Sequence, residues 1–314
     1  MGPDVRQFLT DFRYVEQAEE QVTGLDRAKG ERDLLGDVAK RIAEASLSRV
    51  GFEDHKLSVR QHRRLGESLE GVELVPAGEL VEGLRAVKDA DELRAIRAAA
   101  EVADAAYALI GERGLVGRTE RELALALEEA IRARGSEPSF PTIVAAGPHA
   151  ALPHAEPRDL PIREGELVIV DMGAIVDGYC SDCTRTLGAG SVDGEAAELH
   201  ELVLRAQESA LGAVKAGAGC REVDAAGREV IDAAGHGERL GHGLGHGVGL
   251  EVHEGPRLSP NSTDGDLESG MVVTIEPGVY LPGEAGVRIE DLVVVTDGGC
   301  EVLSGFPKQL DAAR

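Results

Sequence analysis

The chain has 314 residues, of which 42% are hydrophobic and 29% are charged, enough for one large domain or a large and a small one. Its formal net charge of −24 argues against nucleic-acid binding and disfavours contact with anionic membranes. The N-terminal stretch has no apolar signal-peptide core, no apolar run approaches the ~18 residues that span a bilayer, and only four cysteines occur. We therefore expect a cytoplasmic protein without a disulfide framework.

Residues 1–83 alternate short β-like and helix-like segments. Strands are expected at 6–10, 49–54 and 72–77, and helices at 37–45 and 57–69. The pattern predicts a small α/β domain, followed by a larger domain of residues 84–314.

The larger domain begins with two helices and then turns to β-branched runs, and this order occurs twice. Thr119 is a predicted helix N-cap and Gly135 a helix stop. Helices are expected at 89–113, 119–134, 194–217 and 220–235, and strands at 140–147, 166–187, 271–281 and 286–303. The repetition predicts an α+β fold with pseudo-two-fold symmetry, whose halves begin near residues 89 and 194.

Carboxylates interrupt the apolar strands of the first half. Asp171 lies in "LVIVDMGAIV" and Asp182 in "GYCSDCTRTL", and Asp177-Gly178 between them is a hairpin signal. In such a hairpin Asp171 is opposite Thr184, and Asp182 lies two residues along on the same face.

The second half has the same feature. Glu276 interrupts "VVTIEPGVYL", Glu290 interrupts "GVRIEDLVVV", and the turn at 282–286 joins the two strands. A single acid of this kind would most simply be interpreted as a surface residue. Apolar residues flank all four acids, however, which argues against that interpretation. Two unit charges about 5 Å apart repel by about 3 kcal/mol at an effective dielectric constant of about 20. Converging acids must therefore share protons or hold cations.

The glycine-rich stretch "GHGLGHGVGLEVHEGP" supplies imidazoles, of which His246 is the most central. Its glycines allow the backbone to approach a crowded centre. Four carboxylates and one imidazole suit two divalent cations about 3.5–4 Å apart. Oxygen-rich ligation favours Mn²⁺ or Co²⁺, with Zn²⁺ and Fe²⁺ as alternatives.

Two other patterns have simpler interpretations. His242 and His246 have the spacing of a helical zinc motif, but the intervening glycines oppose a helix. Cys180 and Cys183 have redox-motif spacing, yet they bracket Asp182 in an apolar stretch and no second pair follows, which favours buried thiols. Five histidines lack a surrounding constellation and are interpreted as surface or packing residues: His55, His62, His149, His200 and His236.

At these motifs the chain resembles the pita-bread (M24-type) metallopeptidases, which include methionine aminopeptidase, aminopeptidase P and prolidase. Four separated blocks match in the family's order: "VDMGAIVDGYCSDCTRT", "GHGLGHGVGLEVHEGP", "TIEPGVY" and "GVRIED". The resemblance covers about residues 84–310. The helix "VKDADELRAIRAAAEVAD" and the run "GPHAALPHAEP" resemble its proline-specific branch of aminopeptidase P and prolidase.

The resemblance implies a role for each matching residue. The implied ligands of two metal ions are Asp171, Asp182, His246, Glu276 and Glu290, with Asp182 and Glu290 bridging both ions. His154 and His253 would donate hydrogen bonds to the reacting substrate, and Glu276 would also accept a proton. The implied substrate-binding and positioning residues are His242, Arg257, Tyr280 and Arg288.

The implied reaction is hydrolysis of the Xaa-Pro bond, at a peptide N-terminus or in a dipeptide, by a hydroxide that bridges the two ions. A cytoplasmic homodimer acting on peptides with proline in second position is expected. The alternatives are a metal-free pita-bread hydrolase or a peptide-binding module. Compared with the family, the first strands of the N-terminal α/β domain have no counterpart in residues 1–83, so either this domain is truncated or the chain starts at an internal methionine.

Overall fold

The computed structural model describes residues 5–312. The chain divides into two compact units, one up to Val81 and one from Glu82. Helix α4 (Leu80–Ala86) crosses this division. Among the described residues, no helix combines the length and apolar content that crossing a membrane requires.

The N-terminal unit contains two pairs of parallel strands and three helices. The predicted strands and helices are confirmed, whereas helix α1, strand β2 and helix α4, which begins in this region, were missed. The pairs are β1 (Gln7–Thr10) with β2 (Asp26–Lys29) and β3 (Arg49–Phe52) with β4 (Glu73–Pro76), and the helices are α1 (Val15–Gln21), α2 (Leu34–Glu44) and α3 (Val59–Ser68). Ala39 and Ile42 of α2 pack against Leu65 and Leu69, which closes a small apolar core.

The first half of the second unit begins with the two predicted helices, α5 (Ala90–Arg113) and α6 (Glu120–Arg132). Asp89 and Thr119 each start a helix with a capping box, and Gly135 follows α6 with a φ of +77°. One three-stranded antiparallel sheet has the order β10-β7-β6 and another β5-β8-β9. The strands are β5 (Glu137–Pro138), β6 (Ile143–Ala146), β7 (Leu167–Met172), β8 (Ala174–Val176), β9 (Tyr179–Cys180) and β10 (Cys183–Gly188), with a 3-10 helix η1 (Gly147–Ala151) after β6.

The second half repeats this order. Helices α7 (Gly194–Ala213) and α8 (Cys220–Ala233) precede a five-stranded sheet of order β12-β11-β13-β16-β17 and the hairpin β14-β15. The remaining elements are η2 (Gly237–Arg239), β11 (Gly245–Gly247), β12 (Glu254–Leu258), β13 (Val272–Ile275), β14 (Gly278–Leu281), β15 (Ala285–Arg288), β16 (Asp291–Thr296) and β17 (Gly299–Val302).

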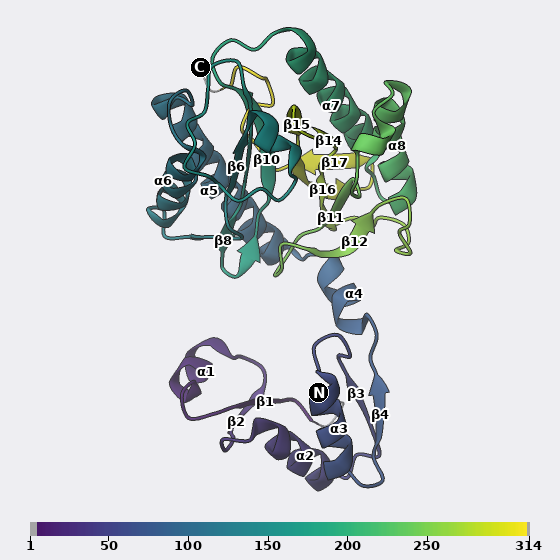
Figure 1. The fold of residues 1–314 in the computed structure, drawn as a ribbon. Coiled ribbons are helices and arrows are strands. Elements are labelled where there is room, and N and C mark those ends of the chain that lie inside the picture. Colours follow the sequence, from purple (N-terminus) through teal and green to yellow (C-terminus); the bar gives the residue numbers. More distant parts are fainter. Residues whose placement is uncertain (1–4, 313–314) are drawn as a thin grey trace. The chain divides into compact units, whose positions relative to one another are not determined.

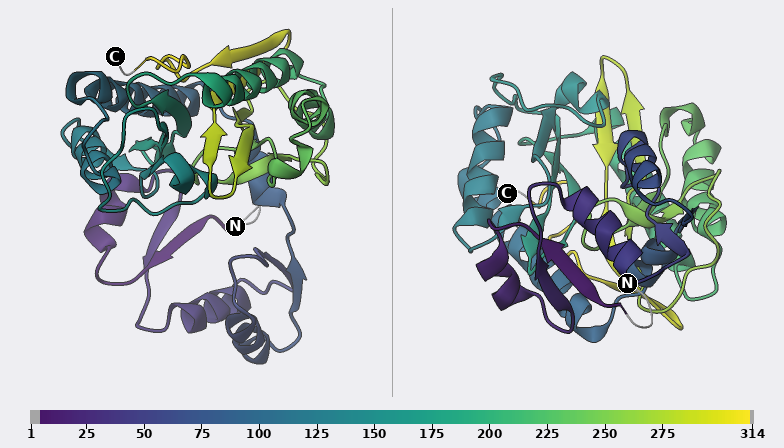
Figure 2. Two further views of the ribbon diagram at one scale, coloured as in Figure 1. Left: turned by 45° about the horizontal axis from the view of Figure 1, so that its top comes forward. Right: turned by 90° about the horizontal axis from the view of Figure 1, so that it is seen from below.

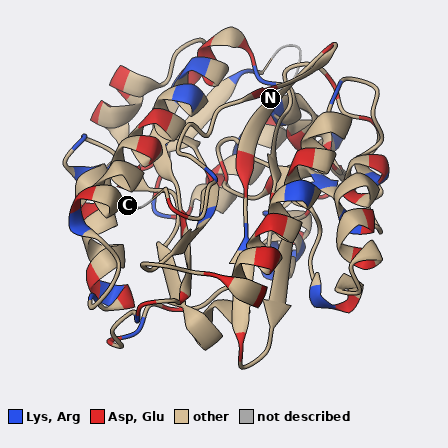
Figure 3. Cartoon of the chain, turned by 90° about the horizontal axis from the view of Figure 1, so that it is seen from above, with Lys and Arg blue, Asp and Glu red and all other residues tan. Residues whose placement is uncertain are grey.

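The two helix pairs of this unit lie on opposite sides of the strands. Figure 1 and both views of Figure 2 show α5 and α6 on one side and α7 and α8 on the other. Asp and Glu are spread along these helices among Lys and Arg (Figure 3), as expected of faces that contact water. The strands, which carry or flank the acids singled out from the sequence, therefore lie between the two helix pairs.

Two of the apolar clusters of this unit, one in each half, anchor strands β7 and β13. Val168, Val170 and Met172 of β7 pack with residues of α5 and α6, and Val273 and Ile275 of β13 pack with residues of α7 and α8. Burial of each such side chain stabilises the fold by about 1.5–3 kcal/mol. Polar groups on the other face of the same strands are consequently held in place.

The predicted hairpins are correct in part. Asp171 pairs with Thr184 and Val176 with Tyr179, as the sequence predicted, and Asp177 and Gly178 have the positive φ of the expected turn. The prediction of continuous strands was wrong, because each strand is broken near its acid.

Two local features account for the breaks. β7 and β8 belong to different sheets, and at Gly173 between them a Cβ would lie 1.8 Å from the Ser181 carbonyl oxygen. Pro277 separates β13 from β14 and cannot donate to a ladder. Asp182, Glu276 and Glu290 consequently lie just outside the strands, where the backbone leaves its sheet.

Candidate metal centre

Three of the predicted ligands come together from distant parts of the sequence. Ligand atoms of Asp182, His246 and Glu290 all lie within 4.8 Å of one another. Asp182 precedes β10, His246 lies in β11, and Glu290 lies between β15 and β16. Residues of both halves of the second unit therefore meet at this point.

Glu276 joins the group through His246. Its Oε1 is 3.2 Å from His246 Nε2, which is also 3.6 Å from Asp182 Oδ2. His246 Nδ1 is 3.0 Å from the Gly247 carbonyl oxygen, which only accepts, so Nδ1 donates there. This hydrogen bond directs Nε2 towards the carboxylates, as in metal-ligating imidazoles. Thr274 accepts from the His246 backbone N–H and donates to Glu276.

The fifth predicted ligand, Asp171, is held by an arginine. Arg288 Nη2 donates to Asp171 Oδ2 over 2.6 Å, and its Nε donates to Thr184 Oγ1 over 3.1 Å. The Thr184 hydroxyl in turn donates to Glu290 Oε2 over 2.8 Å. Thr184 therefore connects two predicted ligands, a role that the sequence prediction missed although it placed this threonine opposite Asp171.

The glycines around His246 are required by packing. A Cβ at Gly245 would lie 1.9 Å from the Thr274 carbonyl oxygen, and one at Gly247 would lie 2.0 Å from the Gly255 carbonyl oxygen. Neither position has room for a side chain, which explains the glycine-rich sequence. The imidazole thus lies on a short strand, and the helical zinc motif is excluded.

Burial and mutual repulsion both raise the pKa values of acids in the metal-free centre. Burial and the negative charge of Glu290 raise the pKa of Asp182 well above its usual range, and burial and Glu276 do the same for the pKa of Glu290. Burial raises the pKa of Asp171 despite the opposing charge of Arg288. Without cations these carboxyls retain protons at a pH at which exposed carboxyls have lost them.

His246 and Glu276 are an ion pair in the absence of metal. Burial favours the uncharged form of each residue. The hydrogen bond and charge of the partner outweigh this effect, so the pKa of His246 is about 9 and that of Glu276 about 2.

The donor set fits two hard or borderline divalent cations. Asp171 Oδ1 and Glu290 Oε1 are buried and have no hydrogen-bond partner within the described residues. Buried carboxylate oxygens without partners are costly and need a proton or a cation. Four carboxylates and one imidazole provide the oxygen-rich environment that Mn²⁺ and Co²⁺ accept.

The predicted substrate residues divide into buried and exposed groups. Tyr280 is buried, and its hydroxyl accepts from Arg288 Nη1 over 3.0 Å and lies 2.9 Å from His242 Nε2. His242 Nδ1 donates to the Gly243 carbonyl oxygen, so Nε2 accepts from Tyr280, and burial lowers the pKa of His242. These side chains hold one another in a fixed network.

The exposed group lies on the solvent side of the centre. The His253 ring is 4.3 Å from the His246 ring between centroids, and partial burial and the charge of His246 lower the pKa of His253. His154 is exposed and close enough for its charge to lower the same pKa further. Arg257 pairs with His246 across β11 and β12, so the two side chains are on one face.

The remaining sequence candidates lie elsewhere. Cys180 and Cys183 are free and buried, and burial raises the pKa of Cys180 to about 11, as expected for unreactive thiols.

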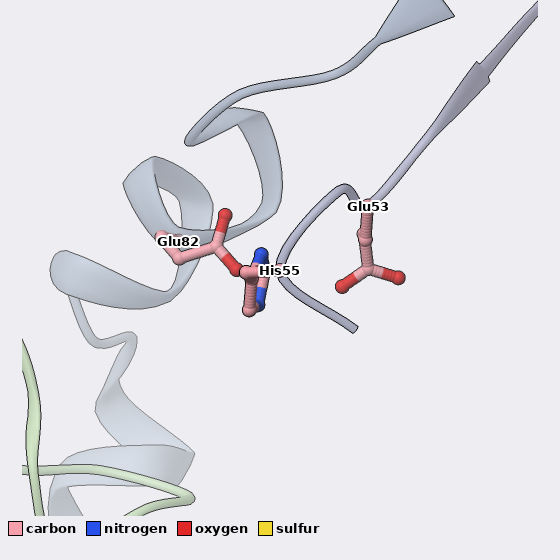
Figure 4. Close-up of side chains that lie close together, drawn as sticks. All are labelled: Glu53, His55 and Glu82. Atoms are coloured by element: carbon pink, nitrogen blue, oxygen red, sulfur yellow. The ribbon is translucent and has the colours of Figure 1, made fainter. Parts of the chain in front are cut away.

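Figure 4 draws Glu53 and His55 on the loop after β3 of the N-terminal unit, and Glu82 on α4, which leads into the second unit. These residues are exposed or half-buried, and we assign them no ion.

Comparison with known proteins defines the class. Residues 94–297 match the model of metallopeptidase family M24, and residues 2–87 match that of the creatinase/prolidase N-terminal domain. The chain belongs to metallopeptidase family M24, has the pita-bread fold with a creatinase-type N-terminal domain, and falls in the aminopeptidase P and prolidase branch. Membership of this family implies divalent metal ions and a peptide substrate.

Three similar proteins illustrate the relationship. An uncharacterized peptidase, YqhT of Bacillus subtilis, is 39% identical over 98% of this chain and 87% of its own length. The structure of an Xaa-Pro dipeptidase from Bacillus anthracis superposes with a TM-score of 0.95 at 40% identity, covering 99% of this chain and 87% of that one. An X-Pro aminopeptidase from Thermotoga maritima has a TM-score of 0.91 at 35% identity, over 99% and 88% of the two chains.

Proposed function

We propose that this protein hydrolyses the bond between an N-terminal residue and a following proline, with two divalent cations, Mn²⁺ or Co²⁺, in the centre described above. Asp171, Asp182, His246, Glu276 and Glu290 would hold the cations, with Asp182 and Glu290 shared between them. The observation that carries the proposal is that ligand atoms of Asp182, His246 and Glu290 lie within 4.8 Å of one another. In addition, Asp171 and Glu290 each have a buried carboxylate oxygen without a hydrogen-bond partner among the described residues. The names of the similar structures, a dipeptidase and an aminopeptidase, support the substrate class.

The cations, when bound, supply Lewis acidity and lower the pKa of water towards about 7. The protein provides orientation and proton transfer. Glu276, which accepts a hydrogen bond from the Thr274 hydroxyl, accepts the proton of the attacking water. His253 and His154, on the exposed side of the centre, donate hydrogen bonds to the developing oxyanion or to the leaving nitrogen.

The buried network has a separate function. Arg288 neutralises Asp171 and fixes Tyr280, which in turn holds His242 at the wall of the substrate site. Arg257, on the same face as His246, is suited to meet a substrate carboxylate if the substrate is a dipeptide. Cytoplasmic location and a homodimer remain predictions from the sequence.

The test uses one preparation for metal content and activity. The purified protein is stripped with a chelator, reloaded with Mn²⁺ or Co²⁺ and offered alanyl-proline, Ala-Pro-Ala and longer Ala-Pro peptides. Cleavage restored by either metal, with free alanine as a product, supports the proposal, and the preferred length distinguishes dipeptidase from aminopeptidase. Absence of metal-restored cleavage on every peptide would favour a binding module.

A further inference from the structure

A buried glutamate outside the metal centre makes an unusual number of hydrogen bonds. Glu120, the first residue of α6, is 3% exposed and takes no part in the chemistry described above. The sequence prediction missed it, because nothing in the residues that follow Thr119 distinguishes Glu120 from an ordinary acid in a first helical turn.

The donors to Glu120 come from both ends of one segment. Its Oε1 accepts from the Ala146 backbone N–H over 2.9 Å, and its Oε2 accepts from the Arg158 backbone N–H over 2.9 Å. His149 Nδ1 lies 2.9 and 2.8 Å from the two oxygens. A single carboxylate thus joins the start, the first turn and the end of residues 146–158.

The same segment contains His154, which is part of the proposed substrate site. The segment also contacts Arg288, which holds Asp171 in the metal centre, because Arg288 Nη1 donates to the Pro153 carbonyl oxygen over 3.2 Å. It also packs against β15, where a Cβ at Gly286 would lie 1.9 Å from the Ala150 carbonyl oxygen. Glu120 holds the segment at three other residues, Ala146, His149 and Arg158. The exposed His154 side chain therefore depends on attachments made at other residues of its segment.

We propose that Glu120 is a positioning residue that holds the segment 146–158, together with His149, so that His154 meets the substrate. The inference rests on the proposed function, since the role of His154 comes from it. His149, which the sequence analysis took for a packing residue, is the side-chain donor of this clamp.

The chemistry requires a carboxylate at this position. A carboxylate only accepts hydrogen bonds, and each donor here has an oxygen to bond. A glutamine of the same shape would direct an NH₂ group at one of the backbone N–H donors, so one bond would be lost and two donors would face each other. Displacement of a substrate-contacting group by about 1 Å lowers turnover by up to about 100-fold.

The experiment compares Glu120→Gln with Glu122→Gln in the full-length protein reloaded with Mn²⁺. Glu122 lies in the same helical turn and is exposed, and its side chain caps the Thr119 N–H. Its replacement weakens the same end of α6 without contacting the segment. His149→Asn is a milder second variant, which removes the imidazole and leaves both backbone donors. Each variant is measured for kcat and KM on alanyl-proline, for metal content, and for amide exchange of residues 147–157.

The expected result is faster exchange of residues 147–157 and a kcat lowered about 10- to 100-fold in Glu120→Gln, with unchanged metal content and KM. His149→Asn should show a smaller change in the same direction, and Glu122→Gln should match the wild type. Exchange or kcat of Glu120→Gln equal to that of Glu122→Gln would overturn the inference. Should Glu120→Gln fail to fold, the same comparison with His149→Asn decides it.

Failure of the proposed function is a separate observation. A wild-type protein inactive on every Ala-Pro peptide would end the assignment of His154 and with it the catalytic part of this inference. The exchange measurement on metal-free protein still decides whether Glu120 holds the segment.

Discussion

Replacement of Asp182 by Asn is expected to change stability in opposite directions in the metal-free and metal-loaded protein. Ligand atoms of Asp182 and Glu290 lie within 4.8 Å of each other. Two full charges at that distance repel by about 3 kcal/mol at an effective dielectric constant of about 20. Because these carboxyls retain protons, part of this repulsion is already relieved, and we expect Asp182→Asn to stabilise the metal-free protein by about 1–3 kcal/mol.

The pH dependence has a defined sign. Burial and Glu290 raise the folded-state pKa of Asp182 well above the 3.8 of an unfolded chain. Between these values the folded protein binds a proton that the unfolded chain has released, so the stability of the metal-free wild type falls as pH rises. The variant lacks this titration and should lose less stability over the same range.

With metal present the sign reverses. Each ion that the wild type binds at 100-fold excess over its dissociation constant contributes about 3 kcal/mol, and a variant without a shared ligand loses at least one ion. Thermal unfolding with and without chelator measures both effects, with an expected rise in Tm of roughly 2–12 °C for the metal-free variant. Elemental analysis of the same samples counts the ions.

The exposed turn variant Asp177→Asn is the control, with an expected effect within about 0.5 kcal/mol. The reasoning would be refuted if metal-free Asp182→Asn were less stable than the metal-free wild type, or if the metal-loaded variant retained two ions.

Three further outcomes are expected. Arg288→Met leaves the buried acceptors of Asp171, Thr184 and Tyr280 without their donor and should cost about 3–5 kcal/mol in chemical unfolding of the metal-free protein; a cost below 1 kcal/mol would contradict the network. Gly173→Ala has no room for its methyl group and should yield little folded protein, whereas Gly212→Ala, at an exposed position of α7 with open space around it, should stabilise by about 0.5–1 kcal/mol; equal yields and stabilities would argue against the packing described. His253→Ala should retain both ions while turnover falls, and arrival of this variant without metal would make His253 a ligand instead.

Much of the fold follows from local sequence signals. Helices α5 and α6 were predictable because Asp89 and Thr119 provide caps and the apolar residues keep helical spacing. The pairing of Asp171 with Thr184 followed from the Asp177-Gly178 turn. Such features depend on neighbours in the sequence.

The breaks in the strands depend instead on distant contacts. Gly173 reads as an ordinary strand residue, and only its approach to the Ser181 carbonyl oxygen shows why β7 ends there. The role of Thr184 is similar, because its hydroxyl connects Arg288 to Glu290 across the two halves. A linear sequence contains no local signal for a contact of this kind.

The candidate site was predictable in composition and less so in detail. The acids stood out because apolar residues flank them, and His246 because glycines surround it. The clamp at Glu120 did not stand out, since its partners are two backbone N–H groups and a histidine at some distance along the chain. Backbone donors have no sequence signature, so support of this type is visible only in three dimensions.

The most direct measurement of the central claim is anomalous diffraction from crystals of this protein soaked in Mn²⁺. We predict two anomalous peaks about 3.5–4 Å apart, both enclosed by Asp171, Asp182, His246, Glu276 and Glu290. The claim is that the two halves of the fold meet to form a dinuclear centre. It would be contradicted by well-diffracting crystals, soaked at saturating Mn²⁺, that show no peak among these residues or show the ions bound elsewhere.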